Sequence, residues 1–363
     1  MAYLGTLLPF PDARAVVERC FRVALSEATV RRRTYTAGRA AEATEAALVR
    51  RLEQSLERAT EKGPPRQQVS ADGAMVRLKG GEWREVRSLV IGTVSAGKDG
   101  PAVSAQSYFS RLCDHEAFIR DCRGEFFRRG TENVDDVAAV LDGADWLGKL
   151  VEEHCPGATR ILDFTHAADA VIAAAHAAFG QGTAACAAWI GPQLHELRHG
   201  QAKKVLAALA TLSKGQGLSP QATETILARR SYLARREAQI QYAAFATAGY
   251  CIGSGIVESA NKHVVQARLK GAGMQWALPN VNALLALRCI DRSKRWTVGW
   301  SNFTPRLRRP LRQASRPPEP IAAPPPAAVP EPLPRTDHAP YFANGKPTKA
   351  HPYKRFPACR AKL

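Results

Sequence analysis

Residues 69–94 read VSADGAMVRLKGGEWREVRSLVIGTV, and this stretch decides the fold. Apolar and polar residues alternate on both sides of a KGG turn at 79–81, which predicts two paired strands over 69–78 and 82–94. A third, short strand is expected near 102–107. Together these segments predict an antiparallel set of strands at the centre of the protein.

Apolar runs and helical patterns alternate further along the chain. We expect a helix over 108–129, strands at 137–141 and 161–164, and helices after them at 144–154 and 166–178. Three strands followed by helix, strand, helix, strand and helix are typical of a mixed α/β domain. The predicted fold class is therefore α/β, with a mixed sheet flanked by helices.

Helical patterns also flank this core. No strand-like run occurs over 181–249, which predicts an all-helical insertion, and 281–290 predicts a last helix. Near the start, 12–38 has the spacing of a helix pair, in which Ser26 can cap the second helix and Gly38 can end it. The second helix carries three consecutive arginines, Arg31, Arg32 and Arg33. A DNA-contacting helix-turn-helix and an ordinary helical hairpin with a solvated basic face both fit this pattern.

Composition shifts divide the chain into six predicted regions. They are a helix-turn-helix-like region (1–40), a connector helix (41–68), the first part of the core (69–180), the helical insertion (181–249), core-closing helices (250–300) and a basic tail (301–363). Ten prolines fall within 317–340. Such a segment cannot pack a core, so we expect the tail to be disordered.

The charge balance favours a polyanionic partner. The 363 residues include 51 Lys and Arg against 33 Asp and Glu, which gives a net charge of +18. This excess favours nucleic acid over an acidic metabolite. No run approaches the roughly 18 apolar residues of a membrane helix, and no signal peptide is expected, so the predicted location is the cytoplasm. The eight cysteines form no C-x-x-C pair, which argues against a zinc ribbon or a redox motif.

Three carboxylates occupy positions that suit a metal-dependent nuclease. Asp72 and Asp142 are both expected at strand ends, Asp72 in the run SADGAMVRL and Asp142 at the end of VAAVLDG, and Glu258 lies on a predicted helix within 253–276. Two Mg²⁺ ions, or Mn²⁺ in their place, need shared oxygen ligands to clamp both oxygens of a phosphodiester displacement. Taken singly, each carboxylate is more often a cap or turn residue, and Asp142 before Gly143 is also an ordinary turn signal.

The Glu258 helix has one apolar stripe at helical spacing: Val257, Ala260, Val264 and Ala267. Glu258 lies beside this stripe, together with Asn261, Lys262 and Arg268. This pattern predicts a DNA-facing surface on which a carboxylate, an amide and cations lie together.

Two further motifs contain histidine. Asp163 and His166 follow a predicted strand and are expected near the metal site, outside the metal ligands, although Asp163 as a helix N-cap explains the pattern equally well. His195, Glu196 and His199 fit H-E-x-x-H, which is a zinc peptidase signature. Because this short pattern often arises by chance, a zinc metallopeptidase is kept only as a remote alternative.

Taken together, these residues resemble the ISKra-type insertion-sequence transposases of the DDE superfamily. The similarity lies in 69–94, in the runs YFSRLCDHEAF, VLDGADWL and RILDFTHAADAVIAAA, and above all in 249–288, GYCIGSGIVESANKHVVQARLKGAGMQWALPNVNALLALR. It extends over roughly residues 1–300. The family usually has a further Cys-bearing part before the run LGTLLPF, so we expect this chain to be shortened at its N-terminus.

The resemblance implies an RNase H-like fold with a catalytic Asp, Asp and Glu, which correspond to Asp72, Asp142 and Glu258. It also implies a helical insertion before the Glu-bearing helix, and related groups carry a C/D-x-x-H signature that Asp163 and His166 match. The expected activity is metal-dependent cleavage and transfer of double-stranded DNA by a homo-oligomer bound to the element ends and the target. The expected DNA contacts, beyond the arginines at 31–33, are Lys262, Arg268 and Lys270. A catalytically silent DNA-binding remnant is the main alternative.

Overall fold

A computed structural model describes the chain at residues 1–55, 59, 63–98, 100–308, 342–343 and 346–347. The chain divides into two compact units, Met1–Arg312 and Gln313–Leu363. Among its described residues, the second unit has a pair of two-residue antiparallel strands, β6 (Phe342–Ala343) and β7 (Lys346–Pro347). The Pro-rich segment predicted to be disordered, 317–340, lies outside the described residues.

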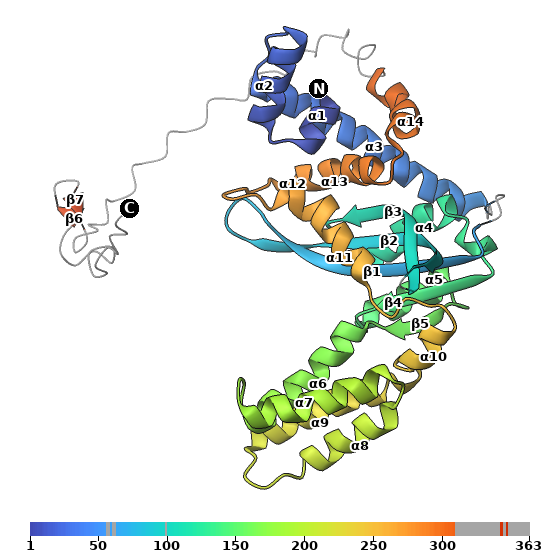
Figure 1. Cartoon of the computed structure of the whole chain (residues 1–363). Coiled ribbons are helices and arrows are strands. Elements are labelled where there is room, and N and C mark those ends of the chain that lie inside the picture. Colours follow the sequence, from blue (N-terminus) through green and yellow to red (C-terminus); the bar gives the residue numbers. More distant parts are fainter. Residues whose placement is uncertain (56–58, 60–62, 99, 309–341, 344–345, 348–363) are drawn as a thin grey trace, which may run out of the picture. The chain divides into compact units, whose positions relative to one another are not determined.

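The first unit is built around a five-stranded mixed sheet with the order β3-β2-β1-β4-β5 (Figure 1). Strands β1 (Arg66–Arg77), β2 (Trp83–Gly97) and β3 (Gly100–Arg111) form an antiparallel meander. Strands β4 (Asp136–Leu141) and β5 (Thr159–Leu162) are parallel to β1. The predicted α/β class and the hairpin at 69–94 are therefore confirmed.

Two helices cover one face of the sheet. Helices α4 (His115–Arg128) and α5 (Asp145–His154) pack against strand residues that point to this side, among them Val69, Leu89 and Ala139. These three side chains are fully buried, and alternation along the strands sends their neighbours to the opposite face. A short 3₁₀ turn, η1 (Thr131–Asn133), leads from α4 into β4.

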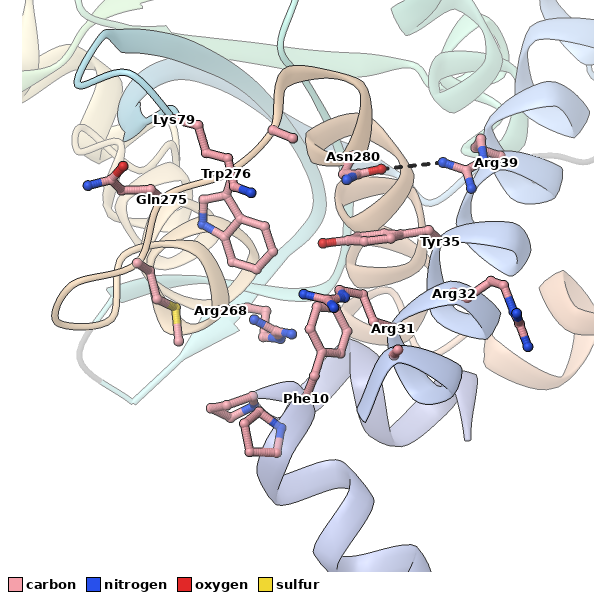
Figure 2. A pocket seen from close by; sticks show the side chains of 15 residues that line it. Phe10, Arg31, Arg32, Tyr35, Arg39, Lys79, Arg268, Gln275, Trp276 and Asn280 are labelled. Atoms are coloured by element: carbon pink, nitrogen blue, oxygen red, sulfur yellow. Dashed lines mark hydrogen bonds between the residues drawn. The ribbon is translucent and has the colours of Figure 1, made fainter. Parts of the chain in front are cut away.

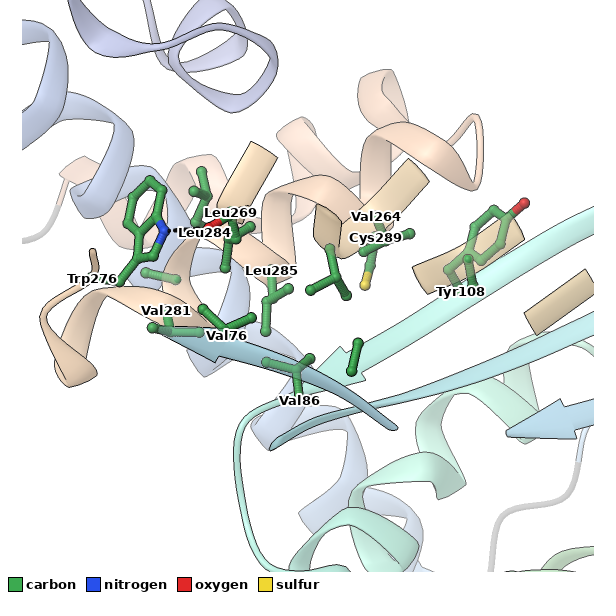
Figure 3. Packing of buried hydrophobic residues seen from close by; sticks show 14 of the residues in the cluster. Val76, Val86, Tyr108, Val264, Leu269, Trp276, Val281, Leu284, Leu285 and Cys289 are labelled. Atoms are coloured by element: carbon green, nitrogen blue, oxygen red, sulfur yellow. Dashed lines mark hydrogen bonds between the residues drawn. The ribbon is translucent and has the colours of Figure 1, made fainter. Parts of the chain in front are cut away.

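The opposite face of the meander is covered by the C-terminal helices. These are α11 (Gly255–Ala260), the π-helical turn η3 (Asn261–Gln266), α12 (Ala267–Leu269) and α13 (Leu278–Arg292). Figure 3 shows Val76 and Val86 of the sheet packed beneath Val264, Leu284 and other residues of these helices. The run that carries Glu258 is therefore docked directly on β1 and β2.

The predicted helical insertion is confirmed over its described length. It contains no strand, and consists of α7 (Ala184–Arg198), α8 (Ala202–Leu212), α9 (Pro220–Ala234), the 3₁₀ turn η2 (Glu237–Gln239) and α10 (Tyr242–Thr247). It packs with α6 (Phe164–Phe179) in one apolar cluster that also includes residues of β4 and β5. In Figure 1 these helices extend away from the β4 and β5 edge of the sheet.

The N-terminal helices differ from the expected pair. After α1 (Ala2–Leu7) and α2 (Phe10–Phe21), a single helix α3 runs over Glu27–Ser55. The predicted cap is confirmed, because Ser26 Oγ accepts a hydrogen bond of 3.1 Å from the Thr29 N–H. The predicted helix end at Gly38 is wrong. Gly38 lies inside α3, where a Cβ would overlap the carbonyl oxygen of Ala283 on α13, so this glycine permits close packing of the two helices.

Two other boundaries also differ from prediction. The expected helix over 108–129 begins only at His115, because β3 continues to Arg111, and Tyr108 and Ser110 pair with β2. Asp114 then caps α4 by accepting a hydrogen bond from the Ala117 N–H. In the predicted tail, residues 301–308 belong to helix α14 (Trp296–Arg308), which buries Phe303 in a cluster with residues of α3 and α13.

Candidate active site

Asp72 lies within β1, and Asp142 directly follows β4, the parallel neighbour of β1. The ladder between β1 and β4 pairs Arg66 with Asp136 and Val69 with Ala139, an offset of 70 residues. Asp72 and Asp142 have the same offset but lie three residues beyond the last pair of this ladder. Adjacent strands lie about 4.8 Å apart. Asp72 is thus in the middle of β1, where the sequence led us to expect a strand end, whereas Asp142 directly follows β4 as predicted.

Asp72 is held from two sides. Its Oδ1 accepts a hydrogen bond of 2.7 Å from the Gly73 N–H, and its Oδ2 accepts one of 2.8 Å from Asn261 Nδ2. Burial raises the pKa of Asp72 above its ordinary value, the Gly73 N–H opposes this shift, and the Asp142 charge adds to it. A partly buried carboxylate beside a second carboxylate is a site that favours a cation.

The turn that bears Asp142 is fixed by the helical insertion. Tyr232 of α9 donates its hydroxyl hydrogen to the Asp142 carbonyl oxygen at 2.6 Å, and Arg236 donates to the Gly143 carbonyl oxygen. Asp142 Oδ1 accepts a hydrogen bond of 2.8 Å from the Ala144 N–H. Gly143 has φ +84°, and a Cβ there would lie 2.7 Å from Arg236 Nε and 2.9 Å from the Tyr232 hydroxyl. Only glycine fits this position without strain.

Asp163 joins two elements of the site. The ladder pairs Leu141 with Leu162, so Asp163 comes next to the end of β4, as predicted. Its Oδ1 caps α6 by accepting hydrogen bonds from the N–H groups of Thr165 (2.7 Å) and His166 (3.2 Å), and its Oδ2 accepts one from the Ser254 N–H. Burial opposes the charged form, but hydrogen bonds from the side chains and backbone N–H groups of His166 and Ser254 hold the pKa of Asp163 well below its ordinary value. Asp163 is therefore both the helix cap and a link to the start of α11.

His166 lies beside the three aspartates. Its Nδ1 is 3.4 Å from Asp163 Oδ1, and 45% of its side chain is exposed. Hydrogen bonding to Asp163 raises the pKa of His166 above its ordinary value, against the effect of partial burial. The charges of Asp142 and Asp72 act in the same direction. The imidazole is thus a partly exposed, readily protonated group at the edge of the carboxylate cluster.

Glu258 lies between two anchored points of its helical run. Ser254, just before α11, is bonded to Asp163, and Asn261, one turn after Glu258, is bonded to Asp72. Of these two contacts only that of Asn261 is made by a side chain, and Glu258 lies three residues before Asn261 in the same run. Its side chain is exposed. Within the described residues, no group of three or more His, Cys, Asp or Glu side chains is placed to hold a metal ion.

The π-helical turn changes which residues of this run are buried. Val257, Ala260 and Val264 are buried as predicted, but Ala267 is exposed, and Arg268 takes the buried position instead. A π-turn adds a residue to the helical repeat, which shifts the face of every later residue. The predicted apolar stripe is therefore correct as far as Val264, within the π-turn, and wrong at Ala267, directly after it.

The predicted DNA-contacting cations have different surroundings. Lys262 and Lys270 are exposed, as are the three arginines at 31–33. Arg268 is only 2% exposed, and its Nε and Nη2 each donate to the Gly5 carbonyl oxygen at 3.2 Å. The sequence predicted that Arg268 shares an exposed surface with Glu258 and Lys262, and this prediction is wrong.

The H-E-x-x-H segment spans the end of α7. The rings of His195 and His199 have centroids 4.3 Å apart, and Glu196 forms an ion pair of 3.3 Å with Lys204. Among the described residues, no third His, Cys, Asp or Glu is grouped with them as a metal ligand. The pair lies in the helical insertion, on the helix that precedes α8.

Several site contacts had no signal in the sequence. Tyr232 and Arg236 are one helical turn apart, a spacing that is also common in ordinary buried faces. Ser254 donates its backbone N–H to Asp163, and because nearly every residue type has a backbone N–H, the identity of residue 254 gave no sign of this contact. Asn261 was predicted on the helix surface, but it is 5% exposed and its Oδ1 is buried without a hydrogen-bond partner.

No protein-family model and no curated protein matches this chain. Among the described residues, no helix combines the length and apolar character needed to cross a membrane.

Proposed function

We propose that this chain is a DNA transposase with an RNase H-like catalytic domain, which cleaves and transfers DNA strands at the ends of its element. The observation that carries the proposal is the placement of Asp72 on β1 and of Asp142 directly after the neighbouring parallel strand β4, with Asn261 linking Asp72 to the run that bears Glu258. The mixed sheet with helices on both faces is compatible with such a domain.

The donor set fits divalent cations. Asp72 and Asp142 would provide carboxylate oxygens, exposed Glu258 would provide a third, and Asn261 Oδ1 is a buried oxygen without a partner. Mg²⁺ and Mn²⁺ prefer such oxygen ligands. When bound there, the ions would activate the attacking oxygen and stabilise the leaving oxygen of the phosphodiester. The raised pKa of Asp72 reflects burial and a like charge, both of which a cation offsets.

Other residues of the chain position this set. Asp163 fixes the distance between the β5 end and the start of α11, and Tyr232 with Arg236 fixes the Asp142 turn. His166 can place a proton or a positive charge next to a DNA phosphate at the edge of the cluster. The contacts of Asp163, Tyr232 and Arg236 are made within the protein itself, so these residues would position the carboxylates before DNA binds.

The charge of the chain suits double-stranded DNA as the substrate. A net charge of +18 favours a polyanion, and exposed Lys262 follows Glu258 by one helical turn. Such contacts would bind phosphates of any sequence and position the strand over the carboxylates. Recognition of element ends and the assembly of a homo-oligomer on DNA belong to the same proposal.

Cleavage and binding assays test the proposal together. Wild type with Mg²⁺ should cut duplex DNA that carries the sequences flanking its gene, whereas Asp72→Asn, Asp142→Asn and Glu258→Gln should bind it but not cut it. Because one site needs all three, double variants should be little worse than single ones. Asp135→Asn is the matched control, since this exposed carboxylate precedes β4 at the far end of the strand from Asp142.

The assays also separate the alternatives. A wild type that binds DNA but never cuts it, with either Mg²⁺ or Mn²⁺, would support the DNA-binding remnant. Tightly bound stoichiometric zinc that is lost in His195→Ala would support the metallopeptidase. A Glu258→Gln protein that still cuts DNA would remove Glu258 from the catalytic set.

A further inference from the structure

An open basic hollow lies on the α13 side of the sheet, among elements separate from the aspartate cluster. It has a volume of about 710 Å³ and is formed by α2, α3, the turn after β1, the loop before α13 and the start of α13 (Figure 2). Figure 2 shows Arg32 and Arg39 on one side of the hollow and Lys79 on the other, and all three side chains are exposed. An extended polyanion that crosses the hollow can therefore meet cations on both rims.

The first rim is one face of helix α3. Arg32 and Arg39 are seven residues apart, which is close to two helical turns, so they share the face that lines the hollow and lie about 10 Å apart along the helix axis. Over about 10 Å of its axis, duplex DNA carries about three phosphates on each strand. The two arginines can therefore contact different phosphates of one strand. Arg33 is exposed on the same helix but does not line the hollow.

The second rim is fixed by backbone contacts. Leu78 and Trp276 form a parallel β-bridge. The Lys79 N–H donates to the Trp276 carbonyl oxygen at 2.9 Å, and the Trp276 N–H donates to the Arg77 carbonyl oxygen at 3.1 Å. The turn after β1 and the loop before α13 thus form one wall, which holds the backbone of Lys79 in place.

The positive charge of the hollow is not balanced within its lining. No Asp or Glu occurs among the described residues that line it, whereas the hollow between α3 and α14 includes Glu45. Two carboxylates that are close in sequence to the rims have cations of their own, since Glu27 lies 3.7 Å from Arg31 and Glu82 lies 2.6 Å from Arg84. This imbalance favours a polyanion as the ligand.

The aromatic rings of the hollow are already packed. Tyr35 and Trp276 are buried, and the ring centroid of Phe10 lies 5.5 Å from that of Tyr35. The guanidinium carbon of Arg268 lies 4.8 Å from the Phe10 centroid and 5.1 Å from the Trp276 centroid. Proteins that hold single strands stack the bases on accessible aromatic rings. The described lining therefore suits the phosphates of a duplex, whose bases are stacked on one another, better than it suits unpaired bases.

Arg268 adds a buried charge to this lining. Its guanidinium donates to the neutral carbonyl oxygen of Gly5. Burial lowers the pKa of Arg268 to about 10, and Tyr35 opposes this shift. A buried cation whose partner is neutral is costly, and phosphates at the rims would offset part of that cost.

We propose that the basic hollow binds the sugar–phosphate backbone of duplex DNA, with phosphates of one strand at Arg32 and Arg39 and the backbone passing Lys79 on the opposite rim. The inference rests on DNA as the proposed substrate but not on strand cleavage. It adds Arg39 and Lys79 to the DNA-contacting residues and removes Arg33 from them. Because phosphates are alike in every sequence, the hollow would position DNA without reading its bases.

The salt dependence of binding tests the proposal in metal-free buffer, where no cleavage occurs. Fluorescence anisotropy gives the dissociation constant of a labelled duplex at several salt concentrations. Each lost phosphate contact should lower the slope of log affinity against log salt by about 1, so Arg32→Ala, Arg39→Ala and Lys79→Ala should each show this fall. Arg33→Ala is the matched control and should keep the wild-type slope. Thermal unfolding of each variant checks that it is folded.

Acetylation of lysines gives an independent measurement on the unaltered protein. Saturating duplex should protect Lys79 from an amine-reactive ester, as mapped by mass spectrometry. Lys149 should react equally with and without DNA, because it is exposed on α5, which covers the opposite face of the sheet.

Three results would overturn the inference. They are equal falls in slope for Arg32→Ala and Arg33→Ala, an unprotected Lys79 in saturating duplex, and tighter binding of a single strand than of the duplex that is lost in Arg32→Ala. If one of these occurs while wild type still cuts DNA with Mg²⁺, the catalytic proposal stands without the hollow. If the slopes fall and Lys79 is protected but no DNA is cut, the hollow stands without the catalytic proposal.

Discussion

Asn261 Nδ2 donates a hydrogen bond of 2.8 Å to Asp72 Oδ2, and thereby joins two residues that are 189 positions apart in the chain. This bond fixes the helical run that carries Glu258 against the strand that carries Asp72. It also leaves Asn261 Oδ1 buried without a partner beside a carboxylate whose pKa is raised by burial. The side chains of Asp72 and Asn261 therefore lie together where β1 meets the run that carries Glu258.

Asp163→Ala should destabilise the protein by about 2–4 kcal/mol at pH 7. It removes a helix cap, worth about 1 kcal/mol, and leaves the buried Ser254 N–H without its charged acceptor. Because the folded pKa of Asp163 is depressed, its contribution is complete above the unfolded value of about 3.9 and is lost as pH falls through the folded pKa. Urea unfolding at pH 7 and at pH 2 measures both effects.

Asp114→Ala is the control for this loss. Asp114 caps α4 through the Ala117 N–H but is exposed and makes no second link of the Ser254 kind. It should therefore cost clearly less than Asp163→Ala. Equal losses in the two variants would mean that Asp163 is an ordinary cap and that its bond to Ser254 contributes nothing.

Gly143→Ala should both destabilise the protein and reduce cleavage. The substitution places a side chain at φ +84° against Tyr232 and Arg236, with an expected cost of at least about 2 kcal/mol. Gly148→Ala is the matched comparison. Gly148 lies in the middle of α5 with open space around its Cα, so alanine should stabilise it by about 0.5–1 kcal/mol. Thermal unfolding and cleavage rates of both variants test this prediction. A Gly143→Ala protein with unchanged stability and unchanged cleavage would show that the contacts of Tyr232 and Arg236 do not fix the Asp142 turn.

His166→Ala should reduce cleavage about 10-fold and change the free energy of unfolding by less than about 1 kcal/mol. Its pKa is raised by Asp163, so the protonated form persists above pH 6.5 and disappears as pH rises through the raised value. The ratio of the wild-type cleavage rate to the His166→Ala cleavage rate should therefore fall as the pH rises through the pKa of His166. His176→Ala, near the end of the same helix, should leave the pH profile unchanged.

Divalent cations should stabilise the protein in a pH-dependent manner. At 100 times its dissociation constant, Mg²⁺ would add about 2.7 kcal/mol to the free energy of unfolding. Because the folded pKa of Asp72 is raised, the metal-free protein loses stability as pH rises through that pKa, whereas the gain from Mg²⁺ grows over the same range. Melting temperatures of wild type and Asp135→Asn should respond alike, and Asp142→Asn should not respond to Mg²⁺.

The sequence predicted the parts of the fold that local pattern decides. The 69–94 hairpin was found because polar and apolar residues alternate around a glycine turn, and its observed pairing joins Ala71 to Leu89 across β1 and β2. The placement of Asp72 near the end of β4, which Asp142 follows, depends on a parallel register that the sequence alone does not set. Strand β3 was predicted too short, because the burial of Tyr108 against α13 residues is a long-range contact.

Other features depend on long-range packing, which the local sequence pattern does not predict. Gly38 has the usual signature of a helix end, yet it lies within α3, where the close approach of Ala283 leaves no room for a side chain. The π-turn at Asn261–Gln266 changes the periodicity of a helix without a change in residue type, which exposes Ala267 and buries Arg268. The contacts of Tyr232 and Arg236 with the Asp142 turn join the insertion to the site across 90 residues or more.

Iron-directed cleavage of the polypeptide tests most directly whether the three carboxylates share one metal site. Fe²⁺ can replace Mg²⁺ at oxygen ligands, and with ascorbate and peroxide it produces radicals that cut only the chain segments next to it. The account predicts cuts near Asp72, Asp142 and Glu258, suppressed by excess Mg²⁺ and absent in Asp142→Asn. Cuts near residues 72 and 142 but not 258, or cuts confined to 195–199, would contradict it.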